Sequence, residues 1–191
     1  TWWFDSGIKQ SEGHYIDDEQ DGLWSYFSKD GSVAEEITFS GGKRDGRSTV
    51  WLTPEEKQEE KFYRNGKLDG PSTFWENGYR STMTTYKSDS PEGPWVIWFS
   101  NSDQIKEQGF HQKGIREGLT TYYYEDGTMQ REGFFKEGLP DGMWTYWNKK
   151  GEKDFDFDFG SGLQHISLED LVERESTFYK LGEDTPFTGI I

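Results

Sequence analysis

Apolar and polar positions along this chain follow a short phrase that recurs. The segment 141–147 reads DGMWTYW, segment 21–27 reads DGLWSYF, and looser copies begin at Asp45, Asp69, Glu92 and Glu117. A fixed period of this length is typical of repeat proteins, in which each unit is one supersecondary element that buries its apolar face only against its neighbours. The glycines of the phrase, called signature glycines below, are spaced by 24, 24, 23, 25 and 24 residues: Gly22, Gly46, Gly70, Gly93, Gly118 and Gly142.

Each unit contains two strand-like runs separated by turn signals. In the fifth unit the runs are 119–124 and 129–135, with Asp126-Gly127 between them and Glu137-Gly138 after them. Acidic or amide residues followed by glycine between β-prone runs indicate type I′ hairpin turns. Helix is disfavoured because glycine returns about every ten residues and Thr, Tyr, Trp and Phe dominate between. The sequence predicts an all-β fold: one elongated antiparallel sheet of tandem β-hairpin repeats, with about 14 strands over roughly 65–70 Å.

Two units differ in length, and both changes are expected in turns, where they cost least. The unit of Gly70 is one residue short, which we place around 88–91, and the unit of Gly93 is one residue long, which we place around 100–104. Pro71 and Pro94 follow signature glycines directly. Because a strand start tolerates proline, we predict that the signature glycine opens its strand.

Aromatic residues recur at fixed distances from the signature glycine. Adjacent strand residues point to opposite faces, so we predict that positions +2, +4 and +17 form the curved interior, with Phe110 among the +17 residues. Position +5 then lies on the other face beside Thr or Ser at +3, as an aromatic ladder with rings about 10 Å apart. We predict that this ladder is a binding surface. The alternative is that its rings simply pack against Lys and Arg stems. The ladder consists of Phe27, Trp51, Trp75, Trp98, Tyr123 and Trp147.

The repeat pattern divides the chain into an array at 1–162, an irregular or short helical interruption at 163–177, and the start of a further repeat block at 178–191. Ser167 is the candidate N-cap of the short helix. Thr1 falls inside a repeat. We therefore expect either a removed leader or an excerpt of a longer array, and the compartment stays open, with an extracytoplasmic one slightly favoured.

Charge limits the class of partner. Acidic residues outnumber basic ones by 36 to 21, which gives a formal charge of -15. Nucleic acid and anionic lipid both require a basic footprint, so we predict no nucleic acid and no membrane partner. A protein partner with a basic or neutral surface fits better. The absence of cysteine excludes disulfides and thiolate chemistry.

The sequence contains few groups of residues that could bind a metal ion or catalyse a reaction. Asp154, Asp156 and Asp158 alternate with phenylalanines and suggest a cation site, but the EF-hand pattern fails because glycine stands seventh and His165 twelfth. We interpret the run as a solvated strand face. A glutamate recurs near +14, for example Glu107, and such repetition indicates a structural role, through turn amides or cross-strand pairs with Lys and Arg. With His14, His111 and His165 scattered, we predict no catalytic residues, no metal and no cofactor.

With its phrases DGLWSYF and DGMWTYW and its E-x-x-F/Y segments, such as 36–39, 60–63 and 132–135, the chain resembles the bacterial variant of the MORN repeat. Members of that family are often labelled antitoxins of toxin-antitoxin systems, and MORN repeats elsewhere contact proteins and membrane lipids. The resemblance and the residues together favour a non-enzymatic scaffold for protein–protein interaction. The alternatives are carbohydrate or choline binding on the aromatic ladder, antitoxin-like neutralisation of a partner, and edge-to-edge self-association.

Overall fold

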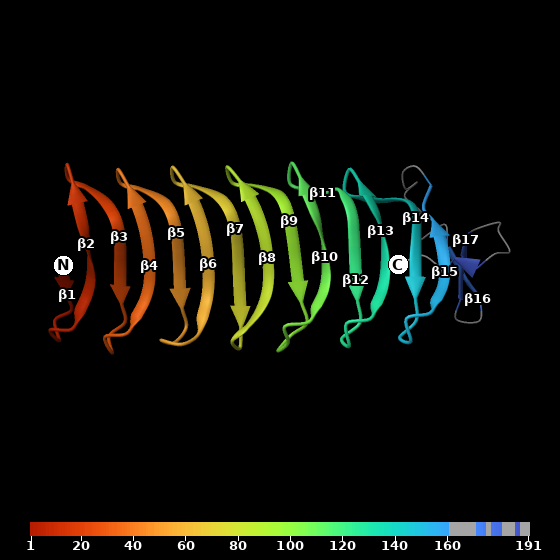
Figure 1. Ribbon diagram of the computed structural model, residues 1–191, viewed down its shortest axis with the longest axis horizontal. Helices are drawn as coiled ribbons and strands as arrows, with labels where there is room; N and C mark the ends of the chain where they lie inside the picture. Colours follow the sequence, from red (N-terminus) through yellow and green to blue (C-terminus); the bar gives the residue numbers. More distant parts are fainter. Residues whose placement is uncertain (161–170, 175–176, 181–185, 188–191) are drawn as a thin grey trace.

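The described residues of the computed structural model are 1–160, 171–174, 177–180 and 186–187, and they form strands and turns without a helix. One antiparallel sheet of 15 strands runs in chain order along the long axis of the molecule (Figure 1), which confirms the predicted fold class. Its strands are β1 (Trp2–Trp3), β2 (Lys9–Ile16), β3 (Glu19–Phe27), β4 (Val33–Ser40), β5 (Lys43–Trp51), β6 (Lys57–Arg64), β7 (Lys67–Glu76), β8 (Tyr79–Lys87), β9 (Ser90–Trp98), β10 (Ile105–Gln112), β11 (Ile115–Arg116), β12 (Gly118–Tyr123), β13 (Met129–Lys136), β14 (Leu139–Trp147) and β15 (Lys153–Asp158).

A second sheet of three strands consists of β16 (Leu171–Arg174), β17 (Thr177–Lys180) and β18 (Pro186–Phe187). Residues 171–174, in the stretch expected to be irregular or helical, are thus a strand. Thr177 of that stretch begins β17, and residues 163–170, Ser167 included, and 175–176 lie outside the described residues.

Turns differ between the two ends of the hairpins. At one end, two-residue turns such as Asn65-Gly66 have positive φ at both positions, 50° and 82°, as a type I′ turn requires. At the other end, in the turn after β3, only Gly31 has a positive φ, of 88°, and its N–H donates to the Ser28 carbonyl at 2.9 Å. This is a type I turn closed by a left-handed glycine, so the prediction of type I′ turns at both ends is wrong there.

Five of the six signature glycines lie inside strands and do not open them, whereas Gly118 opens β12 as predicted. Strand β5 begins at Lys43, three residues before Gly46, and the ladder between β4 and β5 shifts register here, between Ile37 and Phe39. Gly46 has φ 115°, and a Cβ there would stand 3.0 Å from the Cβ of Thr38. The signature glycine therefore makes a β-bulge, which increases the local bend of the strand.

In four units the acidic residue before the signature glycine ties its unit to the next. Asp45 accepts a hydrogen bond from the backbone N–H of Asn65 at 3.0 Å, and Glu92 accepts one from Lys113 at 2.7 Å. Beside the first contact, the N–H of Gly66 donates to the Arg44 carbonyl at 2.7 Å. Successive turns are thus linked by both side-chain and backbone bonds, and we call this contact the turn clasp.

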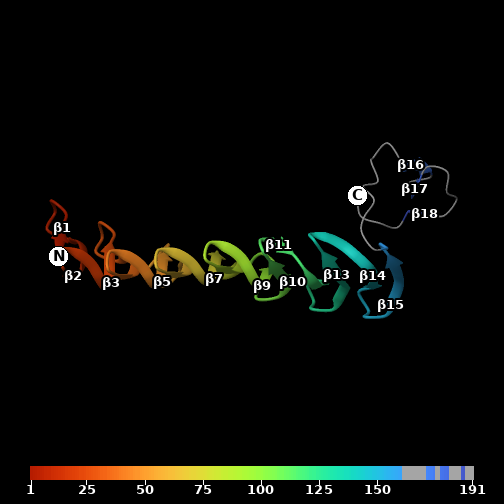
Figure 2. The same cartoon turned by 90° about the horizontal axis from the view of Figure 1, so that it is seen from above.

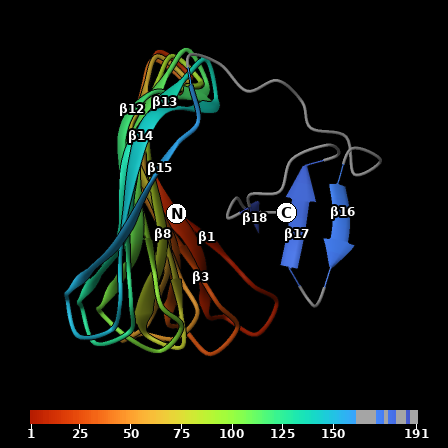
Figure 3. The ribbon, with the colours of Figure 1, turned by 90° about the vertical axis from the view of Figure 1, so that its right-hand side faces the viewer.

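The face that carries positions +2, +4 and +17, called the tryptophan face below, holds the core. Trp24 is 2% exposed and packs on Tyr15, Tyr26 and Phe39, with ring centroids 5.0, 6.2 and 6.4 Å away. The prediction that these positions share one face is confirmed. A single-layer sheet can bury a ring so completely only where it bends around the ring, so this face is the inside of the curve seen in Figure 3, and the same curvature gives the arched strands of Figure 2.

The buried indoles fit against glycines of the preceding strand. A Cβ on Gly13 would stand 2.3 Å from the Trp24 ring, and one on Gly133 would stand 2.2 Å from the Trp144 ring. Each indole N–H donates to the carbonyl that follows its glycine, at His14 (3.0 Å) and at Phe134 (3.1 Å). The indole therefore lies flat across the neighbouring strand, in space that only glycine leaves free.

In the second and third units, which lack this tryptophan, the small residue stands at +2 and the large one on the preceding strand. Ser48 and Ser72 stand at +2 of the second and third units and are buried, and they pair with Ile37 and Lys61 of the preceding strands. A large residue thus faces a small one in both arrangements, as close packing requires.

The unequal units change which face a residue occupies. The short unit loses its residue at the two-residue turn Asn77-Gly78, where Glu76 pairs with Tyr79, and not around 88–91 as expected. The extra residue of the next unit does lie in the turn before β10. It moves His111, paired with Gly93, into the +17 place.

Phe110 therefore lies on the opposite face, 44% exposed, because a shift of one residue reverses the side of the sheet. For the same reason Gln108, which pairs with Thr121, takes the +14 place, while Glu107 lies on the tryptophan face. The predicted positions of Phe110 and Glu107 were wrong.

We predict that Gly133→Ala lowers the free energy of unfolding by about 1–3 kcal/mol, because the new methyl group collides with the Trp144 indole. In a Trp144→Ser background the same change is expected to cost much less, since the indole is gone. Urea unfolding of the four proteins, followed by far-UV circular dichroism, measures the coupling. Additive effects of the two substitutions would contradict the indole-on-glycine account.

Candidate functional site

The other face of the sheet, called the threonine face below, lies on the outside of the bend. Its middle row alternates the +3 and +14 residues, and Thr49 and Thr121 in this row are buried. On one side of it lies the row of +5 rings. On the other side lies a row formed by the +1 and +16 residues.

The +5 rings alternate with the side chains at +11. Trp51 pairs with Lys57, and Trp75 pairs with Arg80. The Lys57 amine lies 5.4 Å from the centre of the Trp75 ring, and the Arg80 guanidinium lies 4.8 Å from that of Trp98, which is only 8% exposed. No ring contact among the described residues joins two members of the row. The row is thus half-buried and partly covered by cationic stems.

Carboxylates of the middle row hold these lysines. Lys57 bonds to Glu60 at 2.7 Å, Lys9 bonds to Glu12 at 2.6 Å, and Lys9 also lies 5.3 Å from the centre of the Phe27 ring. The repeated glutamate therefore fixes a lysine over an aromatic ring in these units, while turn amides are bound by the signature acids.

The three aspartates of β15 are exposed. Asp156 accepts hydrogen bonds from Lys153 at 2.6 Å and from Thr145 at 2.9 Å, and these bonds lower its pKa. Lys153 thus supplies the positive charge at Asp156 itself. Among the described residues, no group of three or more histidines, aspartates or glutamates is arranged to hold a metal ion, Asp154 and Asp158 included.

Exposed apolar side chains of the threonine face recur in the +1 and +16 row. Its members include Phe110, Leu119, Phe134 and Met143, which are 44–56% exposed. Sequence reasoning missed this row. The available signal was the residue directly after each signature glycine, which is Leu, Arg, Pro, Pro, Leu and Met in successive units.

A groove of about 570 Å³ crosses this row between β9 and β12. Pro94, Phe110 and Leu119 line it, with Gln112 and Glu117 among the polar residues. It lies where pairing is incomplete: β10 pairs with β12 only through residues 107–108, and with the two-residue strand β11 further on. The groove is thus an opening in the apolar part of the row, at the strand that follows the extra residue.

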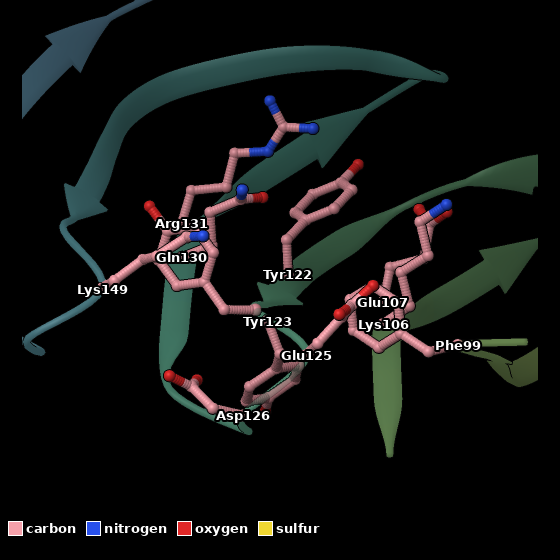
Figure 4. Close-up of a pocket in the computed structure, with 11 residues that line it drawn as sticks. Phe99, Lys106, Glu107, Tyr122, Tyr123, Glu125, Asp126, Gln130, Arg131 and Lys149 are labelled. Atoms are coloured by element: carbon pink, nitrogen blue, oxygen red, sulfur yellow. The ribbon is translucent and has the colours of Figure 1, made fainter. Parts of the chain in front are cut away.

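A larger hollow of about 840 Å³ lies among β10, β12, β13 and their turns (Figure 4). Arg131 lies against Tyr122, with the guanidinium carbon 4.0 Å from the ring centre, and Lys149 approaches from the next unit. Arg116 donates to the Tyr122 hydroxyl at 3.1 Å and pairs with Glu107 at 3.4 Å. The hollow therefore brings Arg131 and Lys149 together with rings from both faces of the sheet, Tyr122 of the tryptophan face and Tyr123 of the +5 row.

The His111 ring lies 5.7 Å from that of Trp95, and its Nδ1 is buried without a hydrogen-bond partner. Burial lowers the pKa of His111, and the nearby Arg116 lowers it further. His14 is exposed on β2, and His165 lies outside the described residues. The two described histidines are thus on separate strands and far apart in the array.

Comparison with known families supports the repeat assignment at two places. The family model of the MORN repeat variant matches residues 20–40 and 116–137, which are the first and fifth phrases with the strands around them. No curated protein matches the chain. Among the described residues, no helix has the length and apolar character required to cross a membrane.

We predict that His111→Phe stabilises the chain by about 0.5–2 kcal/mol, because Phe stands at the same place in other units and leaves no buried nitrogen unpaired. Because the pKa of His111 is lowered in the folded chain, the unfolded chain binds a proton at this histidine first as pH falls below about 6.5. The histidine therefore lowers the free energy of unfolding as the pH falls, and this loss ends once the pH passes below the pKa of the folded state. His111→Phe should remove that loss. Thermal melts across this pH range test it, with exposed His14→Gln as control; an unchanged pH profile would contradict it.

Proposed function

We propose that this chain is a non-enzymatic repeat scaffold that binds a protein partner on its threonine face. The carrying observation is the exposed apolar row with its groove at Pro94, Phe110 and Leu119. Contiguous exposed apolar surface on a folded protein marks interaction sites. The matched repeat family also fits a scaffold, since repeat sheets present long continuous surfaces.

The surroundings of the row define the chemistry of the partner. Glutamates at +14 follow the apolar row along the sheet, for example Glu36 and Glu132, and Glu117 lines the groove itself. The whole chain carries a formal charge of -15. A partner segment with apolar side chains followed by basic ones therefore fits this face, with the charges speeding encounter and the apolar contact supplying affinity.

We include the +5 row in the same contact surface. Aromatic residues are enriched at interface hot spots, and the row lies on the threonine face together with the groove. A saccharide or choline ligand would need free ring faces in a regular row, whereas Lys57 and Arg80 lie over Trp75 and Trp98. This favours a protein over a glycan. Antitoxin-like neutralisation would be the same binding with a toxin as partner.

We predict that peptides selected against the wild-type chain from a random library contain apolar residues next to Lys or Arg. Phe110→Ser/Leu119→Ser should weaken them about tenfold or more, because both side chains line the groove and are exposed, and removing them deletes contact area without disturbing the core. Leu52→Ser, also exposed but in a turn outside the row and the groove, is the control. Peptides that bind the double variant as well as the wild type would sink the groove as the contact.

The +5 row is tested separately with Trp75→Ala/Trp98→Ala. We expect weaker peptide binding than in the wild type, and a binding constant that falls at high salt because acidic side chains surround the rings. A glycan array is run beside it. If the wild type bound a glycan and the double variant did not, the ligand of this row would be a sugar and not a protein. If peptide binding were unchanged in the double variant, the row would have a packing role only.

A further inference from the structure

Two lysines of the threonine face lie between a carboxylate and an aromatic ring. The Lys57 amine lies 2.7 Å from the Glu60 carboxylate and 5.4 Å from the centre of the Trp75 ring, which belongs to the following strand. Each such ammonium forms a charge-assisted hydrogen bond and a cation–π contact at the same time. The same geometry recurs near the start of the chain, with distances of 2.6 and 5.3 Å, at Lys9, Glu12 and Phe27.

Between these two places, the first unit has the glutamate and the ring but lacks the lysine. Glu36 of β4 is the glutamate, Trp51 of β5 is the ring, and Val33 stands three residues before the glutamate, where the lysine is expected. The register is equivalent, because Glu36 pairs with the +3 threonine Thr49, as Glu60 does with the +3 threonine of β7. A valine therefore replaces the cation in an otherwise complete arrangement.

No other group of the described chain takes the place of the missing ammonium. Among the described residues, Glu36 has no ion pair and no side-chain hydrogen bond, and no cation lies over the Trp51 ring. Instead, a pocket of about 360 Å³ opens at this place, and Glu36 is the charged residue in its lining. We call it the Trp51 pocket, and it is lined by Ser32, Val33, Glu36, Trp51 and Pro54.

Longer side chains stand at the corresponding places of other units. Arg80 lies over the Trp98 ring, and Gln108 donates to the hydroxyl of the +5 tyrosine at 2.9 Å. Met129 stands at the lysine place of the fifth unit, and its unbranched side chain is nearly as long as a lysine stem. Val33 is short and branched, so the first unit keeps a glutamate and a ring with room between them.

We infer that the Trp51 pocket is a binding site for a lysine side chain of a protein partner. The ammonium of that lysine takes the place that Lys57 takes in the second unit: it donates to the Glu36 carboxylate and lies against the Trp51 ring. Its methylene stem packs beside Val33, as lysine stems do along apolar surface. The formal charge of -15 attracts a cation of this kind.

The two internal examples indicate which cation fits the pocket. Both form hydrogen bonds of 2.6–2.7 Å between a primary ammonium and a glutamate. A primary ammonium has N–H donors for such a bond, whereas a quaternary ammonium such as choline has none. The inference rests on the proposed function for the source of the lysine, a basic segment of the partner. The preference of the pocket for a primary ammonium can be tested without that partner.

The test is a titration of the whole chain with Nα-acetyl-lysine methylamide, followed by the indole N–H resonances. We expect a saturable shift at Trp51 and none at Trp75, because Lys57 already occupies the equivalent place there. The norleucine analogue lacks the ammonium, the trimethyl-lysine analogue carries a quaternary one, and sodium chloride is the ionic-strength control. An unmoved Trp51 resonance, a shift equalled by sodium chloride, or equally tight binding of either analogue would overturn the site.

Two variants exchange the valine and the lysine between the equivalent places. Val33→Lys supplies an internal ammonium, so the lysine probe should no longer shift the Trp51 resonance. Lys57→Val removes the internal ammonium from the second unit, so Trp75 should gain a saturable shift that the wild type lacks. A Trp51 response that persists in Val33→Lys, or an unmoved Trp75 resonance in Lys57→Val, would refute the assignment.

A third variant tests the carboxylate. Glu36→Gln should weaken the lysine probe about threefold or more, because a neutral amide replaces the charged acceptor. Equal affinity in the wild type and Glu36→Gln would contradict the site, and unchanged resonances of Trp24 and Trp144 on the other face show that each variant is folded. These substitutions leave Phe110 and Leu119 intact. Failure of the peptide selection therefore rejects the proposed function, whereas failure of the lysine titration rejects the Trp51 pocket.

Discussion

Burial of aromatic rings in a sheet that has only one layer is the constraint on which this structure depends. No second sheet or helix covers the described array, so each large ring must find its partners within its own face. The indole of Trp24 does so by lying over Gly13 and donating its N–H to the next carbonyl. The bend of the strands, the glycine bulges and the placement of small residues opposite large ones all serve that burial.

Much of this architecture could be predicted because it is periodic. A 24-residue period, paired turn glycines and alternating aromatics fix the number of hairpins, their antiparallel order and the shared face of +2, +4 and +17. The shape of the turn ends was less predictable, since similar pairs serve different turns: Asn77-Gly78 forms a two-residue turn, whereas Asp30-Gly31 closes a longer one. The bulge at the signature glycine also escaped prediction, because a glycine in a strand pattern looks the same at a bulge and at a strand end.

The candidate sites were harder to predict for two physical reasons. A single inserted residue before β10 exchanges the faces of everything after it in that strand, so Phe110 and His111 traded roles. Exposure is the second reason: the +5 rings are large and regular, yet Lys9, Lys57 and Arg80 lie over three of them, while smaller residues of the +1 row remain exposed. Periodicity shows which residues are equivalent. It does not show which of them neighbouring side chains leave accessible.

The turn clasp gives the array a direction. In four units the carboxylate reaches forward to the turn of the following unit, for example from Asp45 to Asn65 and from Glu117 to Glu137, whereas in the third unit the turn residue Asp89 accepts a bond from Leu68. A newly made unit therefore finds its acceptors already in place on the unit before it, as the ribosome delivers the chain. Like a filament with two unlike ends, the array has a polarity: in these four units the side-chain acceptor lies on the earlier unit and the N–H donor on the later one.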